Sequence, residues 1–276
     1  MTEETRFNIE SHRFDHVEMI STGQERLFAG EWYAFATESH FWFEWRLRVL
    51  LKSLERLGVS LEKQLNVLEV GCGTGTLRAQ LESATNWIVN ATDLDMSALS
   101  QIKPARGKTM YYDICEERSQ YLEAYDVVIL FDVLEHIQDT QPFLTSLLRH
   151  LKPEGLLLIN VPALQILYSN YDEIVGHVRR YDKKTLTEEF KNFTFEIEAV
   201  CYWGLSLVPV VALRKLVLAG LAKRPVSRKI ECGFNPPNRV VHGILRVVMR
   251  AETAMLSHPP LGTSLLLVGR KKASHI

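Results

Sequence analysis

The chain has 276 residues, a formal net charge of −1 at pH 7 and a hydrophobic fraction of 46%. This length suits one sizeable core with an embellishment, and the near-zero charge gives no overall attraction to nucleic acid. Because no uninterrupted apolar stretch reaches about 18 residues and the first residues are polar, we expect neither a membrane span nor a signal peptide.

The four cysteines, Cys72, Cys115, Cys201 and Cys232, form no Cys-x-x-Cys pair and no metal-binding spacing. Such isolated cysteines are typical of reduced thiols. We therefore expect a cytoplasmic protein without a metal site.

The first 60 residues are expected to form a helical arm or lid. Residues 1–38 are polar with scattered aromatics, which favours short helices or an ordered arm. Apolar residues then recur at helical spacing from Trp42 onward, and Gly58 is a suitable residue to end that helix. Trp42 and Arg46 either pack this helix against the core or, together with His40, form a lid over a bound ligand.

The first strand of the predicted sheet runs directly into a turn rich in glycine. Asn66–Val70 is apolar apart from Glu69 and is followed by Gly71-Cys72-Gly73-Thr74-Gly75. Glycines at alternate positions let the backbone adopt unusual φ and ψ angles and let a ligand lie against it. Because an acid precedes the turn, the pattern favours a cationic ligand over a pyrophosphate, which needs bare N–H groups. A tight turn without a ligand is the alternative.

Beyond this turn, apolar strands alternate with helices, which predicts an α/β fold with a doubly wound, mostly parallel sheet of seven strands. We expect a core of residues 61–204 and 263–272, and a helical insertion, residues 205–262, before the last strand. The remaining strands are predicted at Trp87–Thr92, Thr109–Tyr112, Tyr125–Phe131, Gly155–Val161, Phe193–Cys201 and Ser264–Lys271, and the core helices at Thr76–Ser83, Ser97–Ile102, Thr140–Leu151 and Lys183–Phe190.

Carboxylates end several of these strands, at the edge where open α/β sheets bind their ligands. Asp93 lies about 20 residues after Gly71, a position from which a carboxylate can accept both hydroxyls of a ribose. Asp113 could accept from an adenine amino group, with Ile114 packed on the ring. Each acid alone is more often a helix N-cap, but acids at successive strand ends are harder to explain by capping.

Two later segments extend this pattern, namely Phe131-Asp132-Val133-Leu134-Glu135-His136-Ile137 and Leu151-Lys152-Pro153-Glu154-Gly155. With the glycine turn they resemble the class I S-adenosylmethionine (SAM) methyltransferases, in particular the small-molecule, ubiquinone-type subgroup. The resemblance implies a Rossmann-like sheet whose last two strands pair antiparallel, SAM as the cofactor and S-adenosyl-L-homocysteine as its product. The cofactor-binding residues that it implies are Glu69, Gly71, Cys72, Gly73, Gly75, Asp93, Leu94, Asp113, Ile114, Phe131, Asp132, Trp42 and Arg46.

The same resemblance points to an acceptor site in the segments around His136 and His177. Both histidines are candidate general bases, because imidazole titrates near neutral pH, and packing or capping is the alternative. The paired arginines of Gly-His-x-Arg-Arg-Tyr would favour an acceptor with a carboxylate or phosphate, although one of them is expected to bind an acid of the protein itself. A solvated charged turn is the other interpretation. The implied acceptor-binding residues are His40, Tyr168, Arg179, Arg180 and Tyr181.

The insertion is basic and contains two helical stretches, Leu205–Leu221 and about Arg239–Leu256. It is interpreted as a cap over the acceptor pocket, a homodimer contact or a peripheral membrane contact, since basic amphipathic helices bind anionic lipid. Nucleic-acid binding is not favoured, because the sequence has no recognisable module for it.

The sequence therefore predicts a cytoplasmic SAM-dependent methyltransferase that acts on O, N or C of a small organic acceptor, of anionic character or in secondary or cofactor metabolism. Two alternatives stay open. The acceptor could be lipid-linked or membrane-borne, or the protein could bind SAM without methyltransferase activity.

Overall fold

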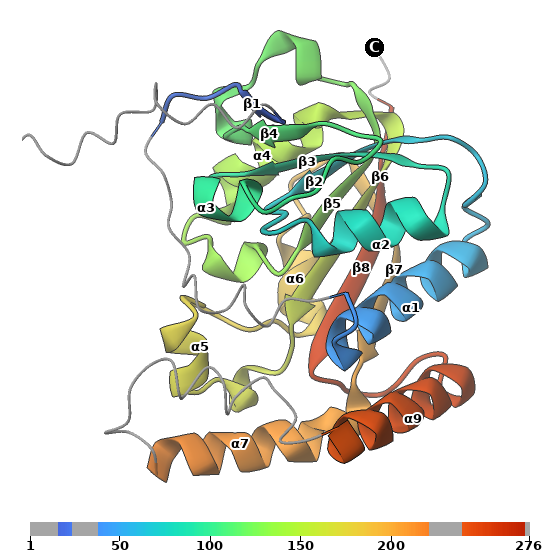
Figure 1. Ribbon diagram of the computed structural model, residues 1–276, viewed down its shortest axis with the longest axis vertical. Helices are drawn as coiled ribbons and strands as arrows, with labels where there is room; N and C mark the ends of the chain where they lie inside the picture. Colours follow the sequence, from blue (N-terminus) through green and yellow to red (C-terminus); the bar gives the residue numbers. More distant parts are fainter. Residues whose placement is uncertain (1–15, 24–37, 221–238, 274–276) are drawn as a thin grey trace, which may run out of the picture.

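The computed structural model describes residues 16–23, 38–220 and 239–273, which form a helix-covered sheet of eight strands (Figure 1). The strand order is β1-β4-β3-β2-β5-β6-β8-β7, in which the first six are parallel and β8 is antiparallel to both β6 and β7. The strands are β1 (Val17–Met19), β2 (Asn66–Val70), β3 (Ile88–Asp93), β4 (Thr109–Tyr111), β5 (Tyr125–Phe131), β6 (Leu151–Pro162), β7 (Phe195–Trp203) and β8 (Ser264–Lys271).

Helices cover both faces of the sheet. Neighbouring residues of a strand point to opposite faces, and both faces carry apolar side chains that pack against helices. Val67 and Val127 pack with α1, α2 and α9, whereas Leu68 and Val128 pack with α4 and α6. The helices are α1 (Phe41–Arg56), α2 (Thr76–Ala84), α3 (Met96–Leu99), α4 (Thr140–His150), α5 (Asn170–Ile174), α6 (Lys183–Glu188), α7 (Val208–Gly220) and α9 (Arg239–Met255), with 3₁₀ turns that include η3 (Ile114–Glu116), η5 (Leu134–His136) and η7 (Leu205–Leu207). No helix in the described ranges combines the length and the apolar character needed to span a membrane.

The predicted order of strands and helices is confirmed, and β2, β5 and β8 have the predicted bounds. The predicted number of seven strands is wrong by one, because β1 adds an eighth strand that pairs with β4. This strand has three residues, of which Glu18 and Met19 are exposed, so it lacks the apolar run by which a strand is recognised. The rest of the predicted arm, residues 1–15 and 24–37, and the basic loop of the insertion, residues 221–238, lie outside the described residues.

Helix α1 lies against one face of the sheet and beside α9 (Figure 1). Its residues Trp45, Leu50 and Leu54 are buried, and the indole Nε1 of Trp45 donates to Oγ1 of Thr253 in α9 at 2.9 Å. The described part of the predicted lid is therefore anchored in the core and joined to the insertion.

The insertion runs along one end of the molecule as α7 and α9 (Figure 1). Glu252 of α9 accepts hydrogen bonds from the backbone N–H groups of Gly204, Leu205 and Ser206 at 3.0, 2.9 and 2.8 Å, and from the Ser206 hydroxyl at 2.6 Å. These N–H groups begin the turn that leads into α7, and their partial positive charge favours a carboxylate. One buried side chain thus joins both insertion helices to the end of β7.

Replacing Glu252 by Ala is expected to destabilise the protein by about 2 kcal/mol, because three backbone N–H groups lose their acceptor. Urea unfolding followed by circular dichroism measures this change. Arg250→Ala, at an exposed position of the same helix, is the control and should leave the urea midpoint unchanged. A wild-type midpoint for Glu252→Ala would show that the carboxylate does not hold the insertion.

Candidate active site

The glycine turn connects the carboxyl end of β2 to α2. Gly71, Gly73 and Gly75 all have positive φ angles, at 73°, 53° and 73°. A Cβ atom at Gly71 would lie 2.3 Å from Cγ2 of Val133, so this position also requires glycine for space. The turn is therefore packed directly against the loop that follows β5, and the two loops form one wall of the site.

Asp93, at the end of β3, fixes the conformation of the glycine turn. Its Oδ2 accepts from the backbone N–H of Gly73 at 2.7 Å, and its Oδ1 accepts from those of Leu94 and Asp95 at 2.7 and 3.0 Å. Burial raises the pKa of Asp93, while these hydrogen bonds act in the opposite direction. Asp113 at the end of β4 is placed differently, since its Oδ1 accepts from Cys115 N and caps η3.

Glu69 is a buried carboxylate beside this turn. Burial raises its pKa to about 7, although the positive charges of Arg46 and Arg78 oppose the change. Its Oε2 accepts no hydrogen bond from the described residues. An acid in this state gains from any cationic group that comes next to it.

Arg46 and Asp132 form a second buried feature, which joins α1 to the end of β5. Nη1 of Arg46 lies 2.5 Å from Oδ2 of Asp132, whose Oδ1 accepts from Asn160 at 2.7 Å. The guanidinium also lies 5.0 Å from the ring centroid of Trp42 and 5.2 Å from that of Phe131. Asp132 has a φ of 58°, which is unusual for a residue other than glycine and is held here by these two partners.

A chain of charged side chains continues from η5 into the loop around α5. Nδ1 of His177 lies 2.9 Å from Oδ1 of Asp172, and Nε of Arg180 donates to the same oxygen at 2.7 Å. Burial acts to raise the pKa of Asp172, but the hydrogen bonds from His177 and Arg180 outweigh it and lower the pKa to about 2. This network fixes the orientation of the His177 ring.

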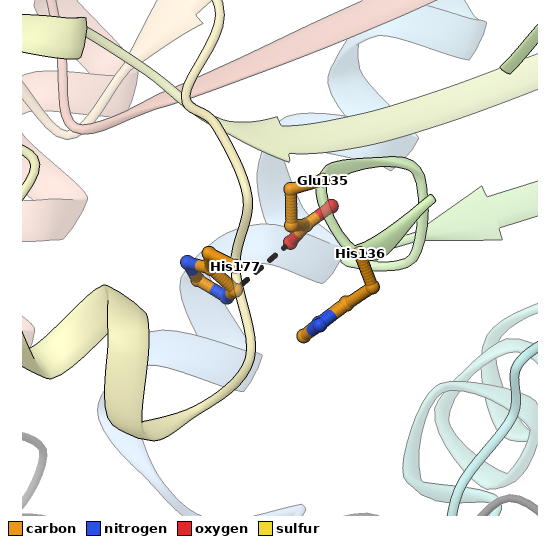
Figure 2. A group of neighbouring side chains, drawn as sticks. All are labelled: Glu135, His136 and His177. Atoms are coloured by element: carbon orange, nitrogen blue, oxygen red, sulfur yellow. Dashed lines mark ion pairs between the residues drawn. The ribbon is translucent and has the colours of Figure 1, made fainter. Parts of the chain in front are cut away.

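Glu135 and His136 lie on the other side of His177 (Figure 2). Oε1 of Glu135 is 3.8 Å from Nε2 of His177, and the rings of His136 and His177 meet edge to face at 4.8 Å between centroids. Burial lowers the pKa of His136 to about 4, assisted by the charge of His177. Burial also raises the pKa of Glu135 well above its ordinary value, and the negative charge of Asp132 adds to this effect.

A cavity of about 850 Å³ connects these features. It extends from the glycine turn past Asp132 to the two histidines and on to α7 and α9. The residues expected at the site that line it are Trp42, Arg46, Glu69, Gly71, Cys72, Gly73, Asp93, Leu94, Asp113, Ile114, Phe131, Asp132, His136, His177 and Arg180.

The other expected residues do not line the cavity. His40 caps α1 by accepting from Trp42 N, and Gly75 begins α2. Tyr168 donates to the carbonyl of His177, whereas Arg179 donates to the carbonyls of Ile137 and Gln138. Tyr181 is buried in the core.

The site also contains residues that were not expected there, among them Glu135, Asp172 and Arg214. Arg214 of α7 lies over the ring of Tyr171 at 4.2 Å and lines the cavity. The sequence signal for Glu135 was its position beside His136 at the end of an apolar strand. Asp172 and Arg214 have no comparable local signal, because their partners lie in other segments of the chain.

Comparison with known proteins gives a family. Residues 42–200 match a family model described as a methyltransferase domain. The ubiquinone biosynthesis O-methyltransferases of Rickettsia canadensis and Rickettsia felis are 34% and 35% identical to this chain over 101 residues. That match covers 35% of this chain and 42% and 41% of the two relatives, so the chain spans less than half of their length.

Two solved structures show the same fold. The S-adenosylmethionine dependent methyltransferase from Mesorhizobium loti has a TM-score of 0.50 and 15% identity, covering 78% of this chain and 94% of that one. The (4+2)-cyclase SpnF has a TM-score of 0.53 and 17% identity, covering 83% of this chain and 82% of that one. At these identities the likeness concerns the fold alone.

Asp172→Asn is expected to lower the free energy of unfolding by about 3 kcal/mol at pH 7, because Arg180 stays buried without its counter-charge. The folded pKa of Asp172 is about 2 against an ordinary value of 3.8, so the stabilisation by its ionised form is complete above the ordinary value. It is lost as the pH falls through the folded pKa.

The difference between wild type and Asp172→Asn should therefore narrow from about pH 5 to about pH 2 in urea unfolding. Glu62→Gln, at an exposed acid, should track the wild type throughout. A difference that stays constant down to the lowest pH would contradict the charged network.

Proposed function

We propose that this chain, which belongs to the methyltransferase-domain family by the match over residues 42–200, is a SAM-dependent methyltransferase that methylates an oxygen of a small acceptor with an apolar extension. The observation that carries this proposal is the continuous cavity that joins the glycine turn, the two histidines and the apolar side chains of α7 and α9.

The residues around the glycine turn fit SAM, which carries an ammonium and a sulfonium. Oε2 of Glu69 has no hydrogen-bond partner among the described residues and offers an acidic group there. Nε of Arg46 is buried and donates to none of the described residues, which leaves it for the cofactor's carboxylate. When bound, SAM supplies an electrophilic methyl group that passes to a nucleophilic atom of the acceptor and leaves S-adenosyl-L-homocysteine.

Asp93 is the residue that we assign to the ribose. A carboxylate has about four acceptor sites, and Asp93 uses three of them for backbone N–H groups. Among the described residues, Oδ2 accepts only from Gly73, so it retains the capacity to accept one ribose hydroxyl. The same residue therefore both braces the turn and binds the cofactor in our proposal.

Arg46 and Asp132 line the cavity between the glycine turn and the two histidines. Their pairing holds α1 against the end of β5 and places the rings of Trp42 and Phe131 on this wall. Apolar rings around the reacting centre exclude water and limit the positions that the acceptor can take. Orientation of the acceptor and exclusion of water are the main contributions that we expect the protein to make to methyl transfer.

The apolar extension of the acceptor is inferred from α7 and α9. Val210 and Leu213 are 50% and 61% exposed, and Ile244 and Val247 are 56% and 67% exposed. The cavity reaches these helices, since Val210 and Leu245 line it. Exposed apolar groups beside a cavity favour an apolar ligand or a lipid surface, so a membrane-borne acceptor is the second candidate. Methylation on oxygen is supported by the names of the two Rickettsia relatives.

Asp93→Ala is expected to weaken SAM binding at least tenfold in calorimetry, because one charged hydrogen bond to the ribose and the brace of the turn are both lost. Asp126→Ala is the matched control, since Asp126 is the second residue of β5, at the opposite end of the strands, and pairs with Lys152. Unchanged SAM affinity in Asp93→Ala would reject the proposed cofactor site.

Methyl transfer from labelled SAM is expected to be at least tenfold more efficient, in kcat/KM, with 4-decylcatechol than with catechol, because the alkyl chain buries apolar surface. Val210→Asp combined with Leu245→Asp, at two positions that line the cavity, should remove most of this difference, whereas Met19→Asp, an exposed position on β1, should keep it. Equal efficiency on both acceptors would contradict the apolar extension, and transfer to neither of these hydroxyl compounds would contradict methylation on oxygen.

A further inference from the structure

Glu135, His136 and His177 each offer one ligand atom, and these atoms all lie within 4.8 Å of one another (Figure 2). Glu135 and His136 come from η5, and His177 comes from the loop after α5. We infer that these three side chains bind one divalent transition-metal ion, such as Zn²⁺ or Mn²⁺.

The state of Glu135 is the first reason. Its side chain is fully buried, and neither of its oxygens accepts a hydrogen bond from the described residues. The neighbouring Asp132 and Asp172 carry the same charge, and Arg180 is already engaged by Asp172. A buried carboxylate without a hydrogen-bond partner is costly, and His177 Nε2 at 3.8 Å is too distant to donate one, so its presence here calls for a positive charge. A cation at the centre of the three side chains would supply it.

The hydrogen bonds behind the histidines are the second reason. Nδ1 of His177 bonds to Asp172, and Nδ1 of His136 lies 3.0 Å from the carbonyl oxygen of Gly176. A carbonyl oxygen only accepts, so His136 carries its proton on Nδ1 and its lone pair on Nε2. Histidine ligands of metals are commonly held by such a bond from the nitrogen that does not bind the metal. Nε2 of His177 is also the atom that faces Glu135.

The spacing and the donor set indicate the kind of ion. Two ligands of one Zn²⁺ lie at most about 4.2 Å apart, since each bond is about 2.1 Å, so the three side chains need to close by only roughly half an ångström from the largest observed separation. Two imidazoles with one carboxylate suit Zn²⁺, Mn²⁺ or Fe²⁺, whereas Mg²⁺ and Ca²⁺ prefer oxygen ligands alone.

The remaining coordination positions would face the cavity, because Glu135, His136 and His177 all line it. An oxygen of the acceptor is the ligand that fits there, and the ion would then hold that oxygen in place. This use of the ion depends on the proposed function, whereas metal binding itself does not. The inference also replaces the expected general-base role of the two histidines, since a nitrogen bound to a metal cannot take a proton.

Zn²⁺ binding to untagged wild-type protein, in competition with a chromophoric chelator, should show one ion per chain with micromolar or tighter affinity. Glu135→Gln and His177→Ala should each weaken it at least tenfold. His258→Ala removes an exposed histidine elsewhere and should bind like wild type. SAM calorimetry on each variant checks that it is folded, because the SAM site that we propose is formed by the glycine turn and Asp93 and not by these three side chains.

A second measurement needs no variant. Co²⁺ added to the wild-type protein should give visible ligand-field absorption that Zn²⁺ abolishes at one equivalent. Absence of stoichiometric binding, or binding that Glu135→Gln and His177→Ala leave intact, would overturn the inference. Tight metal binding in a protein that methylates no hydroxyl acceptor would instead overturn the proposed function and leave the metal site standing.

Discussion

Buried negative charge at the carboxyl edge of the sheet is the constraint on which this structure depends. A carboxylate removed from water is costly unless hydrogen bonds or opposite charges compensate it. Asp93, Asp132 and Asp172 are compensated within the chain, by backbone N–H groups or by arginines. Glu69 and Glu135 each keep at least one buried oxygen without a hydrogen-bond partner among the described residues. Both line the same cavity, and each marks a place where a positively charged group would be stabilised.

Most of the fold could be predicted because the long buried strands leave a strong pattern. β2, β5 and β8 are apolar runs between turn residues, and each has the predicted bounds. β1 could not be predicted, since three partly exposed residues carry no periodicity and become a strand only by pairing with β4. The fold does not by itself determine the reaction, as the similarity to both a methyltransferase and a cyclase illustrates.

The candidate site could be predicted only where its residues follow strands. Asp93 ends β3 and Asp132 directly follows β5, so their presence at one edge follows from the parallel sheet. The sequence indicates that one of the adjacent Arg179 and Arg180 binds an acid of the protein itself. It does not indicate which of the two lines the cavity. Arg180 does so, and Asp172 also holds it. Glu135 and His177 are separated in the chain by α4, β6 and α5. No local sequence pattern predicts that the loop after α5 returns to η5.

The attachment of the insertion through Glu252 bears on how acceptor preference could diverge. The bonds that Glu252 accepts come mainly from main-chain N–H groups, which every amino acid except proline provides. This attachment does not depend on which side chains of α7, such as Val210 and Val211, border the cavity. Related chains could exchange these side chains and acquire new substrate ranges, while the glycine turn, to which we assign the methyl donor, stays unaltered.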